Sequence, residues 1–380
     1  MSRFSRRQAL AGGAAALGAA ALGASALAGA EAANAQPGSA IAPREETKTL
    51  EQLYADAVAE GGTLVVYAGG DRSAAADATR AAWQAQFPNV PLTVVVDYSK
   101  VHDVRIDNQF ATNSLVPDVV QLQTLQDFTR WTKQRKLLRY QPAGAASIHP
   151  VFQDPAGTST AITAIAFSFM YDPALGADAP KSPADLVDPQ WNGRIASSYP
   201  HDDDAVLYLY TLYADAYGWD WMAKLAAQNP QFARGSFTPS AAVSAKQKAV
   251  GVGGSGSLVA PPTSPVRWAV AEGHPFMAWG QRAAIFAEAA HPAAAKLYLN
   301  WSLSVARQKL APYGWSVRTD VPLPAGLKPL WDYPNANIDG FPRFMADRAD
   351  AERWRQTFAL YFGDVQGEPS PGRLGLHPGR

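Results

Sequence analysis

The chain of 380 residues contains no cysteine. This absence excludes disulfide bonds, thiolate zinc sites, cysteine nucleophiles and a lipid-modified cysteine anchor. An excess of either charge is missing as well, since 33 Lys and Arg residues balance 33 Asp and Glu residues. The charge therefore gives no reason to expect nucleic acid or an anionic membrane as a partner.

The N-terminus carries an export pattern. Arg3, Arg6 and Arg7 precede a stretch rich in Ala, Gly and Leu that ends in Ala33-Asn34-Ala35. This arrangement is typical of a twin-arginine signal peptide that is cleaved near Ala35. An Ala-rich membrane anchor or a cytoplasmic helix is the alternative, although Ala and Gly partition weakly into hydrocarbon. We expect an exported, soluble protein that is retained in a periplasm without a lipid anchor.

The remaining chain is long enough, at 47% hydrophobic residues, to bury a large core in two lobes. Strands alternate with helices from residue 48 to about residue 133, which indicates parallel strands in an α/β lobe. Two apolar runs, 160–171 and 275–286, predict long strands that lead into a second lobe and back. The predicted division is a signal peptide at 1–35, a linker at 36–47, lobe 1 at 48–159 and 283–380, and lobe 2 at 160–282.

A histidine and three aspartates, His201 to Asp204, stand directly before an apolar run. Hydrophobic residues recur there at helical spacing from Val206 to Tyr217, so the aspartates are predicted to cap a helix. Carboxylates at a helix N-terminus each stabilise it by roughly 0.3 to 1 kcal/mol. The alternative is a hard-cation site with His201, Asp202, Asp203 and Tyr199 as ligands.

The run "GVGGSG", Gly251 to Gly256, matches the residue pattern G-x-G-x-x-G of the dinucleotide fingerprint but not its structural context. That fingerprint needs a helix directly after it, whereas Pro261-Pro262 force an extended backbone. A hydrolase nucleophile at Ser255 lacks the same helix, and Ser257 stands where a glycine is required. The run predicts either a loop of amides and hydroxyls for a small polar or anionic ligand, or a plain flexible turn.

Arg282 lies in an otherwise apolar strand, and an arginine there is seldom buried without a partner. It either pairs with a carboxylate or faces a cleft and binds an anion. Aromatic residues next to glycine or at strand ends are expected to wall a ligand pocket, and these are Tyr67, Trp279 and Trp315.

Four stretches together resemble the substrate-binding proteins of bacterial ABC importers, in the extracellular solute-binding group that includes ferric-iron binders. They are "LYADAVAEGGTLVVYAGGD", "DLVDPQWNGRIA", "HPAAAKLYLNWSLS" and "YGWSVRTDVPLP", and the resemblance covers roughly residues 48 to 330. It implies a type II periplasmic binding fold: two α/β lobes, each a mixed sheet flanked by helices, joined by a two-strand hinge. It also implies closure over a ligand, and a permease with its ATPase as partners. The absence of a G-x-x-x-x-G-K-[ST] loop fits this division of labour.

Ferric members of the group present paired tyrosines near the strand end that corresponds to "VGVGGSGSL". Here that place holds Gly254, Ser255, Gly256 and Ser257. The resemblance therefore supports the fold and the capture role more strongly than it supports iron as the ligand. Ferric iron or another metal cation is the alternative ligand. A secreted metal-dependent hydrolase is the competing class, supported only by the acidic run.

The sequence thus predicts a binding protein without cofactor or catalytic activity, whose cleft takes a small polar or anionic solute. Ligands bind at the carboxyl ends of strands in such sheets. The candidate ligand-binding residues are Tyr67, Asp71, Arg72, Tyr98 and Gln123 from lobe 1; Tyr199, His201, Ser236, Ser255 and Ser257 from lobe 2; and Trp279, Arg282 and Trp315 beside them.

Overall fold

The structure, a computed structural model, describes residues 43–311, 313–369, 372 and 375–378. These residues belong to one compact unit of the chain. The predicted signal peptide and the first part of the predicted linker lie outside the described residues. No helix within the described ranges is long and apolar enough to cross a membrane.

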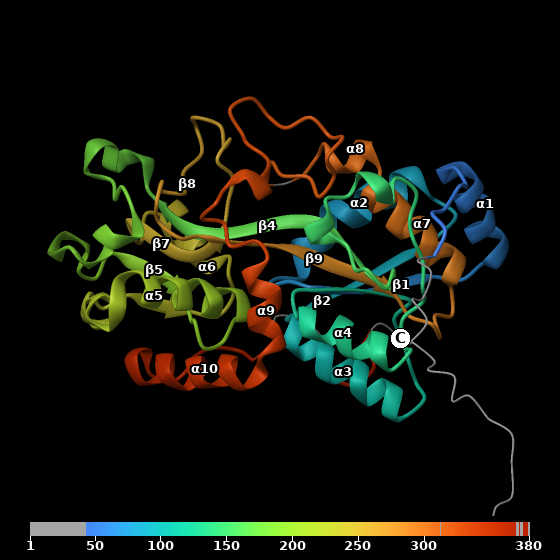
Figure 1. Cartoon of the computed structure of the whole chain (residues 1–380), viewed down its shortest axis with the longest axis horizontal. Helices are drawn as coiled ribbons and strands as arrows, with labels where there is room; N and C mark the ends of the chain where they lie inside the picture. The colour runs from blue at the N-terminus through green and yellow to red at the C-terminus, as the bar shows by residue number, and fades with distance from the viewer. Residues whose placement is uncertain (1–42, 312, 370–371, 373–374, 379–380) are drawn as a thin grey trace, which may run out of the picture. The chain divides into compact units, whose positions relative to one another are not determined.

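Strands and helices follow one another much as the sequence predicts (Figure 1). The strands are β1 (Leu64–Gly69), β2 (Leu92–Asp97), β3 (Val119–Leu122), β4 (Thr160–Tyr171), β5 (Ile195–Ser198), β6 (Gln231–Ala233), β7 (Val250–Ser255), β8 (Arg267–Ala269) and β9 (Met277–Ile285). The α-helices are α1 (Leu50–Glu60), α2 (Asp77–Gln86), α3 (Ser99–Ala111), α4 (Leu125–Lys133), α5 (Asp204–Ala227), α6 (Thr238–Ser244), α7 (Pro292–Leu303), α8 (Val305–Gln308), α9 (Gly340–Ala346) and α10 (Arg348–Phe362). Short 3₁₀ helices lie at Ser73–Ala76, Ala145–Ser147, Pro150–Phe152, Pro173–Asp178, Pro183–Val187, Pro189–Trp191 and Leu330–Asp332.

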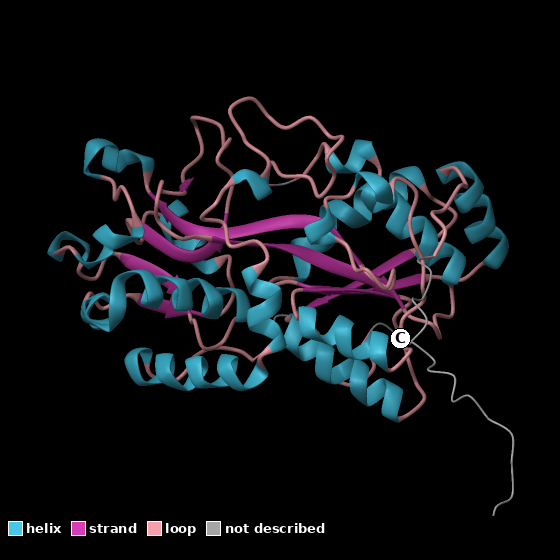
Figure 2. Cartoon of the chain, viewed as in Figure 1, coloured by secondary structure: helices cyan, strands magenta, loops and turns pink. Residues whose placement is uncertain are grey.

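All of these strands form one mixed sheet with helices on both sides (Figure 2). The strand order is β2-β1-β3-β9-β4-β7-β5-β6, and β8 pairs with β4. At one end β1 runs parallel to β2 and β3, and at the other β5 runs parallel to β6 and β7. The long strands β4 and β9 pair antiparallel between them, from Thr160 opposite Ala283 to Phe167 opposite Met277. The predicted mixed α/β architecture with two long central strands is therefore confirmed.

Local signals begin and end the helices where the sequence places them. The Thr49 hydroxyl accepts from the backbone N–H of Gln52, and the Gln52 side chain accepts from the backbone N–H of Thr49. This capping box satisfies two otherwise unpaired N–H groups at the start of α1. Inside α5, Gly218 has φ +80°, a left-handed conformation that glycine adopts without steric cost, and the regular helix is interrupted there.

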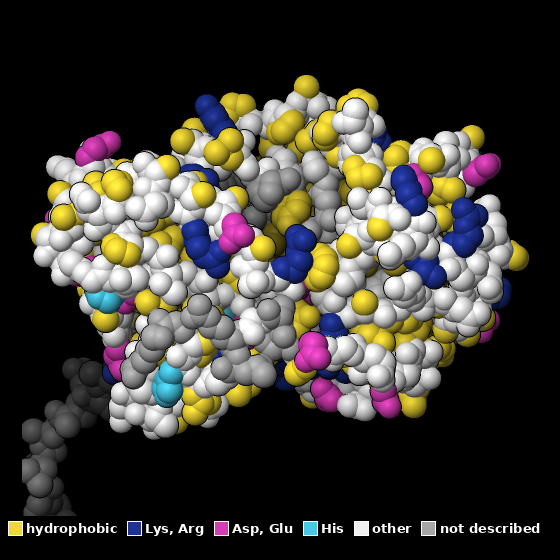
Figure 3. All heavy atoms as spheres, turned by 180° about the vertical axis from the view of Figure 1, so that it is seen from behind, with side chains coloured by type: hydrophobic (Ala, Val, Ile, Leu, Met, Phe, Trp, Pro, Cys, Tyr) yellow, Lys and Arg dark blue, Asp and Glu magenta, His cyan; other side chains and the backbone are white. Residues whose placement is uncertain are grey.

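The surface of the described chain carries mixed charge. On the face seen in Figure 3, basic, acidic and hydrophobic side chains are interspersed among uncharged ones. Charged side chains of both signs are thus spread over this face.

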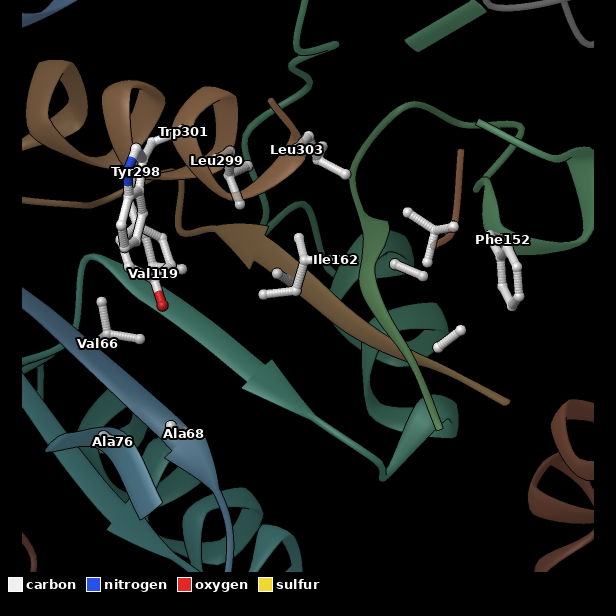
Figure 4. Close-up of a cluster of buried hydrophobic side chains, with 14 of the residues drawn as sticks. Val66, Ala68, Ala76, Val119, Phe152, Ile162, Tyr298, Leu299, Trp301 and Leu303 are labelled. Atoms are coloured by element: carbon white, nitrogen blue, oxygen red, sulfur yellow. The ribbon is translucent and has the colours of Figure 1, made fainter. Parts of the chain in front are cut away.

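Strand alternation divides the core around β1. Val66 points to the cluster that contains Trp301 of α7, whereas Val65 points to the cluster that contains Trp131 of α4. Figure 4 shows Tyr298 of α7 beside Val119 and Val66, and Leu299 and Leu303 of α7 on the side of Ile162. A third cluster joins α5, α9 and α10 to β7 and β9. Apolar burial on both faces fixes the sheet, and with it the positions of the loops at the strand ends.

Candidate functional site

A cleft of about 230 Å³ opens at the carboxyl ends of β1, β2 and β3. Residues 69–72, 98–100 and Gln123 line one side of it. Residues 202–204, 235–237 and Ser255 line the other side, which follows strands β5, β6 and β7. Strands from the two parallel ends of the sheet therefore direct their terminal loops toward one space, as the strand-end rule predicts.

Two hydrogen bonds join the two sides of the cleft through carboxylates. The Ser236 hydroxyl donates to Oδ2 of Asp71 at 2.5 Å, and the Gln123 amide donates to Oδ2 of Asp203 at 3.3 Å. The other oxygen of Asp203 accepts from the backbone N–H groups of Ala205 and Val206 at the start of α5. Asp203 thus serves both as a helix cap and as a wall of the cleft.

Two further contacts bridge the mouth of the cleft. The Lys100 ammonium forms an ion pair with Asp202 at 2.6 Å. The Arg72 guanidinium lies 4.8 Å from the ring centroid of Phe237, within cation–π range. Both basic side chains are exposed, so these contacts are screened by water and hold the sides together weakly.

Two of the carboxylates that line the cleft, Asp71 and Asp203, have raised pKa values. Burial raises the pKa of Asp203 to about 7, and the charge of Asp71 adds to the effect. Burial likewise raises the pKa of Asp71, although hydrogen bonds from Ser236 and the charge of Arg72 oppose it. Burial and the nearby aspartates also raise the pKa of Tyr98 to about 12, so this phenol is neutral at physiological pH. Titratable groups perturbed in this way are typical of functional clefts.

The floor of the cleft comes from the central strands. Trp279 of β9 is buried, donates from its indole nitrogen to the Gln281 side chain at 3.2 Å, and packs edge-on against Phe167 of β4. Trp279 and Gln281 share the cleft face because side chains two positions apart lie on one face of a strand. Arg282 falls on the opposite face of the strand. Burial lowers the pKa of its guanidinium, and the charge of Asp154 offsets only part of this effect.

The structure brings seven of the thirteen candidate ligand-binding residues together. The residues that line the cleft are Asp71, Arg72, Tyr98, Gln123, Ser236, Ser255 and Trp279. The other six lie outside it: Tyr67, Tyr199, His201, Ser257, Arg282 and Trp315.

Two of the outlying aromatic residues are buried in the core. Tyr67 points away from the cleft, where its hydroxyl donates to the backbone carbonyl of Pro378 at 2.8 Å and accepts from Gln109. Trp315 donates from its indole nitrogen to the backbone carbonyl of Lys328 at 3.0 Å. For Tyr67, a place near a strand end does not decide whether the ring faces the cleft, because a strand alternates its faces at every residue.

Tyr199, His201 and Ser257 have partners outside the cleft. Tyr199 is buried and stacks on Phe232, and His201 hydrogen-bonds through Nε2 to the backbone carbonyl of Gly363 at 2.8 Å. The Ser257 hydroxyl accepts from the backbone N–H of Val259. These contacts direct the side chains to neighbouring elements and not into the cleft.

The acidic run is a helix cap, as predicted. Asp203 caps α5, Asp202 pairs with Lys100, and Asp204 pairs with Arg355 of α10. Across the described ranges, no group of three or more His, Asp or Glu side chains is arranged to hold a metal ion. The three neighbouring carboxylates diverge to separate partners, which is the geometry of a cap and not of a chelate.

Several lining residues were not among the sequence candidates. Ser99 and Lys100 directly follow Tyr98, which stands at the end of a strand. Ligands bind at the carboxyl ends of strands, and including the next two residues of the loop would have found both. Gln281 is a polar residue in an apolar strand, a signal that the neighbouring Arg282 obscured. Phe237 and Tyr313 reach the cleft from segments whose local sequence gives no indication of it.

Residues 99–263 match the family model of the bacterial extracellular solute-binding proteins. Iron-bound HitA from Pseudomonas aeruginosa is similar in structure, with a TM-score of 0.61, 19% identity, and coverage of 78% of this chain and 99% of that chain. The AfuA periplasmic binding protein from Actinobacillus pleuropneumoniae, with fructose-6-phosphate bound, has a TM-score of 0.64 and 18% identity over 79% and 98% of the two chains.

A substrate-binding protein of an ABC transporter from Agrobacterium tumefaciens also has a TM-score of 0.64, with 17% identity over 80% of this chain and 94% of that chain. No curated protein matches the sequence. The structural likenesses establish the fold, and the family match covers α3 through the loop after β7. The match over residues 99–263 agrees with the resemblance that the sequence motifs indicated, and the structural likenesses show that the chain has the type II periplasmic binding fold.

Proposed function

We propose that this chain is the periplasmic solute-binding component of an ABC importer. It captures a small polar solute in the cleft between β1–β3 and β5–β7 and delivers it to a membrane permease with its ATPase. It performs no chemistry on the solute. The observation that carries this proposal is the cleft itself, whose two sides come from opposite ends of one sheet and meet through polar side chains.

The cross-cleft contacts suggest how capture is signalled. Asp71 with Ser236, and Gln123 with Asp203, already join the two sides. A solute that bonds to both sides adds its own contacts to these and stabilises the closed arrangement by its differential affinity. We propose that β4 and β9 form the hinge between lobe 1 (48–159 and 283–380) and lobe 2 (160–282), since they link the two parallel ends of the sheet.

Filling the cleft should abolish capture. We expect Ser255→Trp, which places a large ring in the cleft, to lose the bound solute while keeping the fold. Ser257→Trp is the matched control, since Ser257 lies two residues on and outside the cleft. The measurement is the intact mass of protein from its native periplasm under native and denaturing conditions, with the difference giving the bound solute.

Wild type and Ser257→Trp should carry one small-molecule mass excess that Ser255→Trp lacks. A mass excess that persists in Ser255→Trp would place the solute elsewhere and contradict the proposed site. Wild-type protein that carries no solute, and that a broad panel of metabolites fails to stabilise against heat, would contradict the capture role. Turnover of ester or phosphate substrates would contradict the claim that the chain is not an enzyme.

Export should depend on the paired arginines of the leader. We expect Arg6→Lys/Arg7→Lys to leave the precursor uncleaved in the cytoplasm, because twin-arginine signals are read by a receptor that distinguishes Arg from Lys. Fractionation followed by N-terminal sequencing of the periplasmic protein measures both export and cleavage near Ala35. Arg3→Lys is the control, and it should be exported normally. A periplasmic, cleaved double variant would contradict the twin-arginine assignment.

A further inference from the structure

The charge balance of the cleft is unequal. Its lining contains four aspartates, Asp71, Asp202, Asp203 and Asp204, but only two basic side chains, Arg72 and Lys100. The whole chain carries equal numbers of both signs, so this excess of negative charge is local. A local excess in a concave, partly dehydrated space selects the charge of what enters it.

The four aspartates differ in how they are neutralised. Asp202 forms an ion pair with Lys100, and Asp204 forms one with Arg355. Among the described residues, the ion pairs of the cleft aspartates involve Asp202 and Asp204, and neither Asp71 nor Asp203 forms one. Their hydrogen-bond partners are uncharged: a hydroxyl for Asp71, and an amide with two backbone N–H groups for Asp203. Two cleft-facing carboxylates are therefore held by uncharged partners and not by an ion pair.

The basic side chains of the cleft do not supply this compensation. Lys100 is engaged by Asp202, and Arg72 is exposed and stacks over Phe237. The charge of Arg72 lowers the pKa of Asp71, but burial outweighs it and the net shift is upward. Arg282, which the sequence suggested as a balance for a negative ligand, does not line the cleft.

Aromatic rings provide a second, independent feature of the same space. The cleft is lined by Tyr98, Phe167, Phe237, Trp279 and Tyr313. The faces of such rings attract ammonium groups, most strongly where water is excluded. Rings and unpaired carboxylates together provide what an organic cation requires: negative charge for its nitrogen and an apolar surface for its carbon atoms.

From this juxtaposition we infer that the solute is a small organic cation, held by Asp71 and Asp203 against the aromatic walls of the cleft. The inference rests on the proposed function and narrows it to one class of solute. An anion in the cleft would be repelled at close range by two carboxylates that have no ion-pair partner in the described ranges. A bare metal ion would find no group of three His, Asp or Glu ligands among the described residues.

The first test uses matched probes on wild-type protein after exhaustive dialysis. Choline and 3,3-dimethylbutan-1-ol have the same shape, but only choline is charged; benzyltrimethylammonium and 1,4-diaminobutane extend the cation series, and benzoate and inorganic phosphate represent anions. Calorimetry and thermal shift measure binding. We expect at least one cation to bind, with the neutral isostere and both anions weaker by about tenfold or more. Preference for the neutral or anionic probes, or no binding of any cation, would overturn the inference.

The second test removes the two unpaired charges. Asp71→Asn/Asp203→Asn should weaken binding of the best cation by about a hundredfold, roughly tenfold for each carboxylate. Asparagine is also a good helix cap, so α5 should persist, and each single variant provides an independent reading. The control Asp339→Asn/Asp350→Asn changes the net charge equally at two surface positions and should keep affinity within about threefold. Unchanged binding in the cleft variants would overturn the inference.

The two proposals fail in different ways. A neutral or anionic solute that co-purifies with wild type and is lost in Ser255→Trp would leave the capture role intact and overturn the cation assignment. A co-purifying organic cation supports both. Protein that carries no solute, binds none of the probes and is stabilised by no metabolite of the broad panel overturns both.

Discussion

Trp301→Ala should lower the free energy of unfolding by about 3 to 5 kcal/mol, the usual cost of truncating a fully buried tryptophan. Trp301 of α7 is 1% exposed, lies edge-on 5.4 Å from Trp83, and donates from its indole nitrogen to Gln86 at 2.8 Å. The Arg307 guanidinium covers its ring at 4.2 Å. Truncation leaves a cavity between α7 and α2 and removes the hydrogen-bond donor that satisfies Gln86.

Urea unfolding followed by far-UV circular dichroism measures this effect. The transition midpoint should fall while the slope stays unchanged, which is the signature of a loss in stability alone. Leu360→Ala, at a position that is 86% exposed on α10, is the control and should change stability by less than about 0.5 kcal/mol. A loss below about 1 kcal/mol for Trp301→Ala would show that α7 is not held by this contact.

The stability of the solute-free protein should fall as the pH rises from about 4 to about 7, because of Asp203. Burial and the charges of Asp71 and Asp204 raise its pKa to about 7, whereas Gln123 and the backbone N–H of Val206 lower it. The folded state therefore binds this proton more tightly than the unfolded state does. The resulting stability is fully present below the unfolded pKa, near 4, and is lost as the pH passes through about 7.

The comparison with Asp203→Asn isolates this contribution from those of other groups. The variant mimics the neutral form and keeps the cap, so wild type should lose on the order of 1 to 3 kcal/mol relative to it between pH 4.5 and pH 8. This range allows for screening by water in the open cleft. Asp339→Asn provides a comparison of opposite sign, because a hydrogen bond from Arg343 holds the pKa of Asp339 below its usual value. Relative to this variant, wild type should gain a small amount of stability as the pH rises. A difference between wild type and Asp203→Asn that does not change with pH would contradict the burial of this carboxyl.

Features that depend on neighbours in the chain were predictable. The capping box of Thr49 and Gln52, the cap at Asp203 and the interruption at Gly218 each involve atoms within about four residues of one another. The strand at Thr160–Tyr171 matches the apolar run at both ends. Backbone hydrogen bonding and side-chain periodicity decide these features locally, so a sequence read in one dimension contains them.

Membership of the cleft was predictable only in part. Asp71, Tyr98 and Gln123 follow strand ends, and topology alone brings parallel strand ends together. This reasoning does not extend to Gln281 and Arg282 in β9. A shift of one residue in strand register would turn Arg282 to the cleft in place of Gln281, and the sequence alone does not give the register.

The sequence by itself determined the fold class, the cap at the start of α5 and the absence of cysteine chemistry, since each depends on composition or on short-range periodicity. Only the tertiary structure decided that Tyr67 and Tyr199 are buried, that Tyr313 reaches the cleft, and that Asp71 and Asp203 have uncharged hydrogen-bond partners there. The physical reason is that burial and charge compensation depend on distances between segments more than a hundred residues apart. Packing of the whole sheet sets those distances, and no local pattern encodes them.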